Sequence, residues 1–357
     1  MKENIYIFTN SILRKKENTL AIETLQGFNR KDECDITDIE CDTLITPADE
    51  SRGTKAKYIP VDNINSVFTI GSVKFNTHFF SLMSKNGIPV HILNYYGNYT
   101  GSFLPKGDIS SGNILISQVE HYNNDAKRLY IAKQFVESAS INAINNLKYY
   151  LFRKADLKDE IESLKSVTSQ IQNVNSIGEL MGIEGNIKSR YFRCWQKIFK
   201  VETGFTKRVR KPPDNIINSL ISFGNVVFYN ICLNEIFRSG LSPAIGYLHS
   251  PADNRTPLAF DISETFKPII IDKVIFRLVN LDMLSEDDFF INDEKVFLKD
   301  KIKKVFINEI EQRLKTTIYH KNYKRNISYK SLIRLDCYAL IKHLTEDKEF
   351  NPFISEV

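Results

Sequence analysis

The chain has 357 residues, with 48 Lys and Arg against 43 Asp and Glu and a hydrophobic fraction of 42%. This composition is that of a globular protein and excludes a wholly disordered chain. One hydrophobic core seldom grows beyond about 250–300 residues, so the length favours two cored domains. The net charge of +5 indicates an anionic partner only weakly, since proteins that bind no nucleic acid often carry a similar excess.

The cysteines predict a reducing compartment. They are odd in number, widely spread and without CxxC spacing, and no secretory leader precedes them: Cys34, Cys41, Cys194, Cys232 and Cys337. No apolar run approaches the roughly 18–20 residues of a membrane span. We therefore expect a cytoplasmic protein that has no contact with a membrane.

The first part of the chain is strand-rich. Residues 4–24 are short β-prone runs broken by turn residues, and residues 55–105 continue this pattern around a helical stretch at 75–84. Between them, residues 27–53 carry an acidic excess that predicts an inserted hairpin or mobile loop. A calcium loop is the alternative, although the EF-hand glycine and closing Glu are missing. We predict a β-strand domain over residues 1–105.

The hydrophobic period changes from two to about 3.6 beyond a Gly- and Ser-rich linker at residues 106–115. Asp214 is a candidate N-cap and Gly240 a candidate helix stop. The expected helices lie at 125–154, 157–171, 176–200, 214–239, 262–282, 297–315 and 329–345. The predicted fold class is α+β, with an N-terminal β-strand domain followed by a larger all-α catalytic domain at 116–357.

Glu184 stands out among the glutamates because Gly182 and Gly185 flank it beside an apolar helical stripe. Each glycine destabilises a helix by roughly 1 kcal/mol relative to Ala, and small neighbours would let a bulky ligand approach the carboxylate. A solvated surface glutamate is the alternative interpretation.

A second set of polar residues follows a Pro- and Gly-rich loop. His249 lies in that loop rather than on an apolar helix face, and Asp261, Glu264 and Asp272 would share one face of a continuous helix. A structural histidine and a solvated acidic stripe are the alternatives. Carboxylate and imidazole ligands without thiolates suit Mn²⁺ or Mg²⁺ rather than zinc, and they favour phosphoryl chemistry.

Basic residues cluster beside Glu184. Between Glu184 and Lys211 there are nine Lys and Arg against two acids, an excess suited to a phosphate backbone. A solvated face is again the alternative. The candidate DNA-binding residues are Lys188, Arg190, Arg193, Lys207, Arg208, Arg210 and Lys211, together with Arg255 after the His249 loop.

Four segments together resemble the CRISPR-associated adaptation integrases, the Cas-one family. They contain a Glu-Gly pair, a Pro-Pro-Asp followed by Asn-Ser-Leu, and Gly-x-x-His before Asp-x-x-Glu. In this sequence they read 59-IPVDNINSVFTIGSV-73, 183-IEGNIKSRYF-192, 210-RKPPDNIINSLISFGN-225 and 245-IGYLHSPADNRTPLAFDISETFKPIIID-272. Two departures are the acidic 27–53 insertion and Asn186-Ile187-Lys188, where the family commonly has small residues.

The resemblance implies that Glu184, His249 and Glu264 hold a divalent ion, Mn²⁺ or Mg²⁺, with Asp261 as a neighbouring or alternative ligand. It implies an endonuclease and integrase that inserts foreign DNA into a CRISPR array by 3′-hydroxyl attack on repeat phosphates. The implied partners are double-stranded DNA, a second copy bound through the β domain, and a small second CRISPR-associated protein that bridges two dimers.

Two other functions fit the residues. One is a DNA-binding scaffold without catalysis, and the other is an unrelated metal-dependent phosphodiesterase. Because carboxylates in a metal-free site repel one another, we also expect Glu264→Ala to reduce activity far more than stability.

Overall fold

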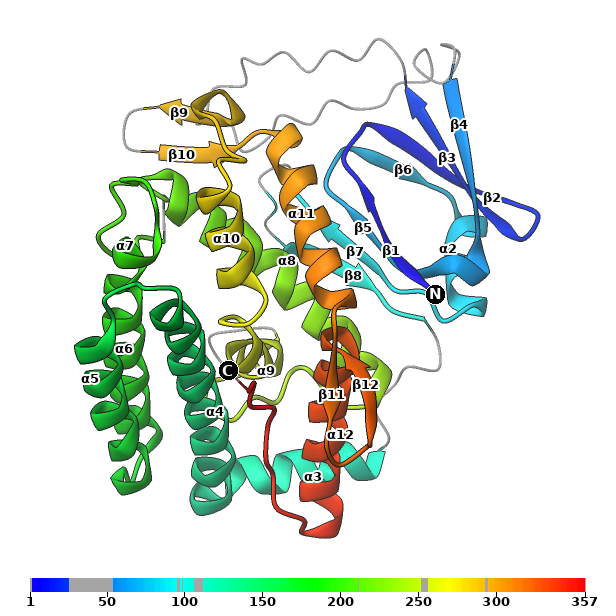
Figure 1. The fold of residues 1–357 in the computed structure, drawn as a ribbon. Helices are drawn as coiled ribbons and strands as arrows, with labels where there is room; N and C mark the ends of the chain where they lie inside the picture. Colours follow the sequence, from blue (N-terminus) through cyan, green and yellow to red (C-terminus); the bar gives the residue numbers. More distant parts are fainter. Residues whose placement is uncertain are drawn as a thin grey trace. The chain divides into compact units, whose positions relative to one another are not determined.

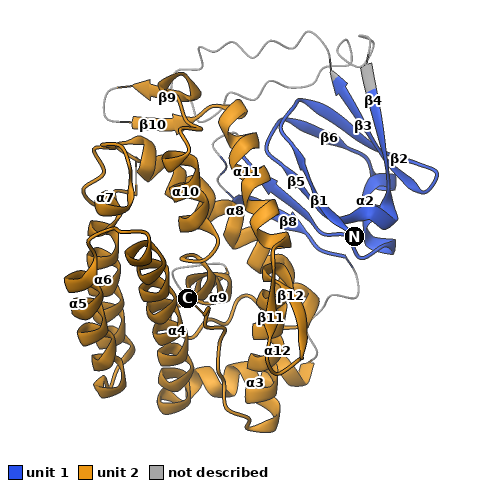
Figure 2. Cartoon of the chain, viewed as in Figure 1, with its two compact units in different colours: residues 1–109 blue, residues 110–357 orange. Residues whose placement is uncertain are grey.

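The computed structural model describes residues 2–25, 54–94, 97, 99–105, 112–210, 212–251, 256–292 and 295–356. The chain divides into two compact units, residues 1–109 and 110–357 (Figure 2). The acidic insertion, the 106–111 part of the linker, Lys211 and Arg255 lie outside the described residues. The predicted fold class is confirmed, because a strand-rich N-terminal part precedes a larger, mostly helical part.

Among the described residues, unit 1 contains two four-stranded sheets and the α-helix α2 (Thr77–Lys85) (Figure 1). The first sheet has the order β1 (Glu3–Ile7), β5 (Ile64–Thr69), β7 (Val90–Leu93) and β8 (Tyr99–Phe103), and only its β7–β8 pair is antiparallel. The second has the order β4 (Thr54–Pro60), β3 (Thr19–Leu25), β2 (Ser11–Lys16) and β6 (Val73–Phe75). The expected hairpin near the N-terminus is the β2–β3 pair.

The core of unit 1 lies between these elements. Leu13 and Leu20 from the second sheet, Val67 and Val90 from the first, and Phe79 from α2 (Thr77–Lys85) all belong to one buried cluster. Asn76 caps α2 by accepting a hydrogen bond from the Phe79 amide at 2.9 Å. The apolar residues that alternate along the strands therefore lie on the faces that pack against the helix.

Unit 2 is built around one central helix, α8 (Ile216–Ser239), which packs against α9, α10, α11 and α12 (Figure 1). Asn215, one residue after the expected Asp214, is its N-cap, and Gly240 ends it with φ +86° as predicted. The other helices are α3 (Gly112–Asn123), α4 (Asp125–Phe152), α5 (Lys158–Thr168), α6 (Ile177–Arg193), α7 (Trp195–Ile198), α9 (Pro257–Phe266), α10 (Ile271–Asn280), α11 (Asp300–Lys315) and α12 (Tyr329–Glu346).

Two expectations about unit 2 need correction. The helix expected at 262–282 is broken into α9 and α10, because Pro268 has no amide hydrogen to donate to the preceding turn. Two hairpins also interrupt the helices. They are β9 (Phe289–Asn292) with β10 (Lys295–Leu298), and β11 (Thr317–His320) with β12 (Arg325–Ser328).

The expectation that no segment is long and apolar enough for a membrane span also needs correction. Among the described residues, α8 passes that test by length and composition. Its side chains are mostly buried against neighbouring helices, which is the usual situation of a core helix.

The C-terminal segment, residues 348–356, packs across the helices of unit 2. Phe350 is fully buried, and the Phe353 ring stacks on Phe266 of α9 with centroids 5.7 Å apart. Asn142 of α4 donates hydrogen bonds to the carbonyls of Thr265 and Phe353, both at 2.9 Å. This segment therefore joins α4 to α9.

Asp336 of α12 gives this contact a pH dependence. Both of its carboxylate oxygens accept from the Phe353 amide, at 3.0 and 3.2 Å, and burial raises the pKa of Asp336 from 3.8 to about 8. A raised carboxyl pKa stabilises the fold fully below the ordinary value, and this stabilisation is lost as pH rises towards 8. We expect Asp336→Asn to gain stability over the parent across this window, by at most about 1.4 kcal/mol per pH unit. Denaturant unfolding at pH 5 and pH 8 measures it, and a constant difference between the proteins would contradict it.

Gly224 of α8 is required by close packing. A Cβ there would lie 2.8 Å from Phe306 Cζ and 3.1 Å from Ile271 Cγ2, whereas a Cβ at Gly182 of α6 would meet nothing within 4 Å. We expect Gly224→Ala to lower the free energy of unfolding by about 1–3 kcal/mol. The matched Gly182→Ala should raise it by up to about 1 kcal/mol. Urea unfolding compares them, and equal stabilisation by both would show that α8 and α11 are not tightly packed there.

Candidate active site

Asp261 organises the loop that carries His249. Its buried carboxylate accepts hydrogen bonds from three consecutive backbone amides, those of Tyr247 (2.6 Å), Leu248 (3.2 Å) and His249 (3.1 Å). The same carboxylate lies 2.7 Å from His249 Nδ1. These contacts fix both the backbone of the loop and the direction of the imidazole, so Asp261 orients His249.

The imidazole is electrostatically tuned by its neighbours. Burial of the His249 ring favours its neutral form, but the hydrogen bond and charge of Asp261, together with the charge of Glu264, raise the pKa of His249 above its ordinary value. Because Asp261 occupies the Nδ1 side, Nε2 is the ring nitrogen that can bind a metal or transfer a proton.

The His249 loop is also held to α3 and α4. Gln118 exchanges two hydrogen bonds with the backbone of Ser242, at 2.8 and 3.0 Å, and Arg128 Nε donates to the Tyr247 carbonyl at 2.9 Å. Gly246 is required here, since a Cβ would lie 2.7 Å from Pro257 Cβ and 2.9 Å from Pro257 C. The loop is thus fixed on three sides.

Glu264 and Glu184 share one cation. Lys188 Nζ lies 2.9 Å from Glu264 Oε2 and also pairs with Glu184, one turn earlier on α6. Lys267 Nζ lies 2.6 Å from Glu264 Oε1. Burial alone would raise the pKa of Glu264, but the two ammonium groups hold it well below its usual range.

This pairing corrects the expectation that carboxylates in the site repel one another. Glu264 is only 7% exposed, so Glu264→Ala would leave the ammonium groups of Lys188 and Lys267 without their shared partner. Removing one member of a buried ion pair typically destabilises a protein by about 3–5 kcal/mol. Stability as well as activity should therefore fall.

Sequence reasoning missed Lys267 and Tyr229. Lys267 Nζ donates to the Tyr229 hydroxyl at 2.8 Å, and the Tyr229 ring packs edge-on against Phe260 of α9. Lys267 follows Glu264 by three residues, which is the spacing of an ion pair on one helix face and could have identified it.

Asp272 does not join this group, contrary to the shared face expected for Asp261, Glu264 and Asp272. The break after α9 places Asp272 on α10, where Tyr191 donates to Oδ2 at 3.0 Å. Asn146 donates in turn to the Tyr191 hydroxyl at 2.8 Å. Burial raises the pKa of Asp272 to about 7. This polar contact joins α4, α6 and α10, and so positions the helix that carries Glu184.

The candidate ligands surround an ammonium group, where a divalent ion would have to bind. Over the described part of the chain, no three His, Cys, Asp or Glu side chains already stand close enough to hold a metal. However, Glu184 and Glu264 both direct oxygens at the Lys188 ammonium, which is itself a cation. With His249 Nε2 nearby, the groups fit Mn²⁺ or Mg²⁺ provided that the ammonium leaves.

The predicted phosphate track is not one continuous face. At about 100° per residue, Arg190 lies about 120° and Arg193 about 180° around α6 from Glu184. Arg190 donates to Asn186 at 2.9 Å and to Ser163, on the side of α5. Lys188 is committed to the two glutamates. The expected DNA contacts of these three residues remain predictions.

Arg208 has a structural role at the start of α8. Its guanidinium donates to Asn218 Oδ1 at 3.1 Å, to Ser222 at 2.9 Å and to the Val209 carbonyl. Lys207 and Arg210 beside it are exposed, whereas Lys211 and Arg255 lie outside the described residues. DNA contact by Lys207 and Arg210 therefore stays a prediction.

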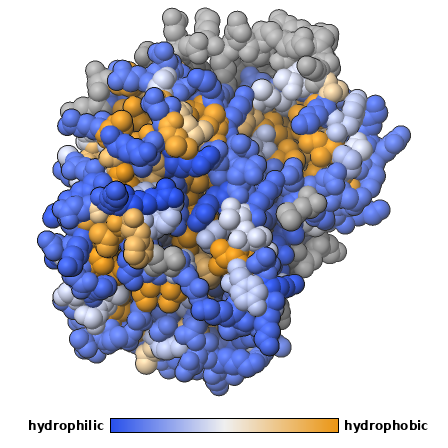
Figure 3. Space-filling model, viewed as in Figure 1, coloured by the Kyte–Doolittle hydropathy of each residue, from blue (hydrophilic) through white to orange (hydrophobic). Residues whose placement is uncertain are grey.

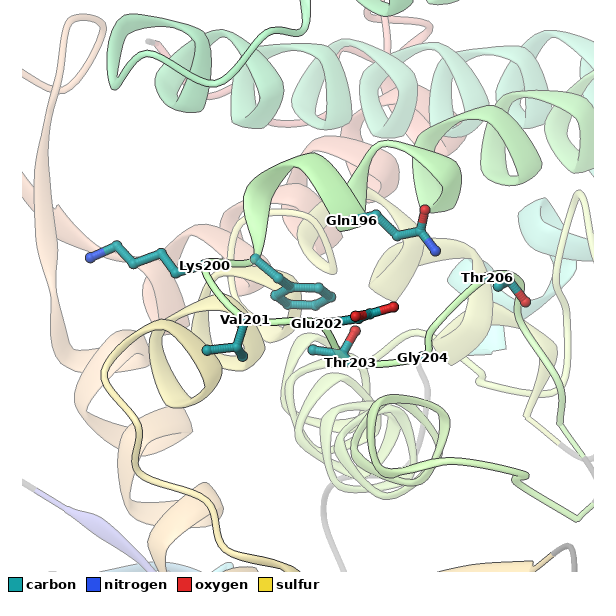
Figure 4. A pocket seen from close by; sticks show the side chains of 8 residues that line it. Gln196, Lys200, Val201, Glu202, Thr203, Gly204 and Thr206 are labelled. Carbon is teal, nitrogen blue, oxygen red and sulfur yellow. The ribbon is translucent and has the colours of Figure 1, made fainter.

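A hollow elsewhere in unit 2 is separate from these residues. It has a volume of about 400 Å³ and is formed by the 196–206 segment, with Glu202, Thr203 and Gln196 among its lining side chains (Figure 4). None of its lining residues is Glu184, His249 or Glu264. The hollow therefore does not contribute to the candidate site.

Known proteins resemble nearly the whole chain. The family described as CRISPR associated protein Cas1 matches residues 5–312. A CRISPR-associated endonuclease Cas1 of Fusobacterium nucleatum is 41% identical, with 99% of this chain and 96% of the relative covered. The solved structure of a Cas1 protein from Thermotoga maritima is 32% identical and covers 98% and 99%, with a TM-score of 0.80. A casposase bound to its integration product shares the fold at 20% identity and TM-score 0.83, covering 100% and 95%.

The four contacts of Asp261 predict a large effect of removing its charge. In Asp261→Asn, the amide group would face backbone donors, so we expect a loss of about 2–4 kcal/mol. The matched Asp272→Asn should lose less, because that carboxyl accepts from Tyr191 and has a pKa near 7. Urea unfolding at pH 7 compares the two, and an equal loss would argue against a special role for Asp261.

Proposed function

The chain belongs to the Cas1 family of CRISPR-associated proteins, and from this we propose that Glu184, His249 and Glu264 carry its reaction at DNA phosphates. It is a nuclease and integrase of CRISPR adaptation. The observation that supports this assignment is the convergence of Glu184 and Glu264 on one cation, beside an imidazole that Asp261 orients.

We propose that Mn²⁺ or Mg²⁺ binds Glu184, Glu264 and His249 Nε2. When bound, such an ion polarises the phosphate and stabilises negative charge on the attacking and leaving oxygens. For the ion to enter, Lys188 would leave the two carboxylates. Lys267 would stay on Glu264, since its second contact with Tyr229 holds it there.

The depressed pKa of Glu264 suits this role. Its carboxylate stays ionised at any physiological pH because Lys188 and Lys267 stabilise the charge, so a metal would not compete with a proton for it. Asp261 holds Nδ1 of His249 and so leaves Nε2 on the other side of the ring. Glu264 is therefore ionised, and His249 oriented, before any ion binds.

The proposed reaction is a transesterification. A 3′-hydroxyl of incoming DNA attacks a phosphate of the CRISPR repeat, forming a new phosphorus–oxygen bond while the bond to the repeat's own 3′ oxygen breaks. The hydroxyl proton goes to solvent, because both ring nitrogens of His249 would be engaged, and the departing oxygen takes up a proton from solvent. With water as the nucleophile, the same exchange is endonucleolytic cleavage.

Partners are proposed from relatives and fold neighbours. One solved neighbour is a casposase bound to an integration product, and others are Cas6-RT-Cas1–Cas2 complexes. We propose that this chain binds double-stranded DNA and a small second CRISPR-associated protein that bridges two dimers. We further propose that it forms homodimers through the β domain and acts in the cytoplasm.

The test is strand transfer from a 3′-hydroxyl DNA into a repeat-bearing plasmid, with the second CRISPR-associated protein present and Mn²⁺ or EDTA added. We expect joining by the parent only with the metal. His249→Ala should lose at least about a hundredfold, because removing only a group that supports a metal ligand already costs about 10–100-fold. The matched control Lys342→Ala changes an exposed side chain of α12 and should join DNA normally.

Activity surviving in His249→Ala would overturn the ligand assignment. Specific DNA binding by the parent without any joining would favour a scaffold, and cleavage of RNA in preference to DNA would favour an unrelated phosphodiesterase. Thermal unfolding of each variant separates loss of chemistry from loss of fold.

A further inference from the structure

The β11–β12 hairpin lies in a long segment without negative charge. Residues 312–335 contain seven Lys and Arg and no Asp or Glu. Within residues 317–328 every side chain except two isoleucines carries a hydrogen-bond donor. A segment that offers donors and positive charge, and has no carboxylate of its own, is suited to a partner that presents acceptors and negative charge.

The hairpin has an inner and an outer face. Ile318 pairs with Ile327, which is 4% exposed, so this pair faces the protein. On the opposite face Tyr319 pairs with Asn326, and the Tyr319 side chain is 63% exposed. The outer face is therefore polar and aromatic while the inner face anchors the ribbon.

Further donors gather at the tip, residues 321–324. Tyr323 is 48% exposed there, and Lys324 beside it adopts φ +50°, as in a tight turn. Lys324 and Arg325 are exposed. At this place in Figure 1, the surface in Figure 3 is mixed, with pale and hydrophilic residues around a small hydrophobic patch.

The base of the hairpin is rigid. Arg313, just before it, donates from Nε to the Ile269 carbonyl at 2.9 Å, in the turn that follows α9. Its guanidinium lies 4.6 Å from the centre of the Tyr329 ring, and the Tyr329 amide donates to the Thr316 carbonyl at 3.1 Å. Both ends of the hairpin are thus fixed next to the helix that carries Glu264.

One carboxylate, from the C-terminal segment, lies on this surface. Glu356 pairs with Lys321 at 2.6 Å, and both side chains are 76% exposed. An ion pair in water contributes at most about 1 kcal/mol, so a phosphate could replace Glu356 readily.

We propose that the β11–β12 hairpin is a DNA-binding arm that contacts the backbone of duplex DNA outside the catalytic residues. This inference rests on the proposed function, which supplies DNA as the substrate. Lys, Arg, Tyr, Asn, Ser and Thr are the side chains that contact phosphate and sugar oxygens, and a two-stranded ribbon fits a major groove of about 12 Å. An acidic protein would match the charge, but it would not require two exposed tyrosines among the donors.

The experiment measures binding of the full chain to a labelled duplex by fluorescence anisotropy in EDTA, between 50 and 200 mM salt. We expect Lys324→Gln with Arg325→Gln to weaken binding several-fold. The slope of log K against log salt should become shallower by about 1–2, since each lost phosphate contact removes about 0.9. Tyr319→Ala should weaken binding with little change in slope.

The matched control is Lys342→Gln with Lys348→Gln, which removes the same amount of charge from two exposed lysines. Lys342 lies on α12, and Lys348 lies two residues beyond its end. If the control weakened duplex binding equally, only the overall charge would matter, and the proposed DNA-binding role of the hairpin would be wrong. Unchanged duplex binding in the hairpin variant, or a loss confined to single-stranded DNA, would overturn it too. If the parent itself binds no duplex, the proposed function fails first, so the two failures are distinguishable.

Discussion

The site depends on a single buried carboxylate. Asp261 accepts from the three amides of residues 247–249 and from the His249 ring, so one side chain satisfies a loop that has no secondary structure of its own. Backbone amides buried without partners are strongly unfavourable, and this requirement fixes where the imidazole stands. The position of His249 relative to α9 is thereby set by Asp261, one turn before Glu264.

The other buried carboxyl groups of α9 and α10 each have their own partners. Glu264 is held ionised by Lys188 and Lys267, while Asp272, with Tyr191 as a neutral partner, has a pKa near 7. The pKa values of two buried carboxyls on neighbouring helices thus shift in opposite directions because their partners differ. Of the two, Glu264 is the one that meets Glu184 at a shared cation, which a divalent ion would replace.

Much of this could be predicted from local sequence. The helix bearing Glu184, the loop bearing His249 and the three-residue spacing of Asp261 and Glu264 are short-range patterns. In the structure Glu184 and Glu264 meet at Lys188, and His249 contacts Asp261. The interruption at Pro268 also has a local signal, since proline breaks helices, yet the apolar period continues through it and hides the break. What a charge contacts across elements has no such signal. The sequence shows that Lys188 is basic, but only the fold shows that Lys188 of α6 faces Glu264 of α9 while Arg193 faces away.

The C-terminal segment bears on how the site is completed during synthesis. Phe353 stacks on Phe266 of α9, and Asn142 bridges the carbonyls of Thr265 and Phe353. A ribosome makes residues 261–264 well before residue 353 emerges, and chains fold from the N-terminus as they are made. A nascent chain therefore carries its carboxylates on a helix whose outer packing is unfinished, and α9 acquires its last aromatic neighbour only when this segment has left the exit tunnel.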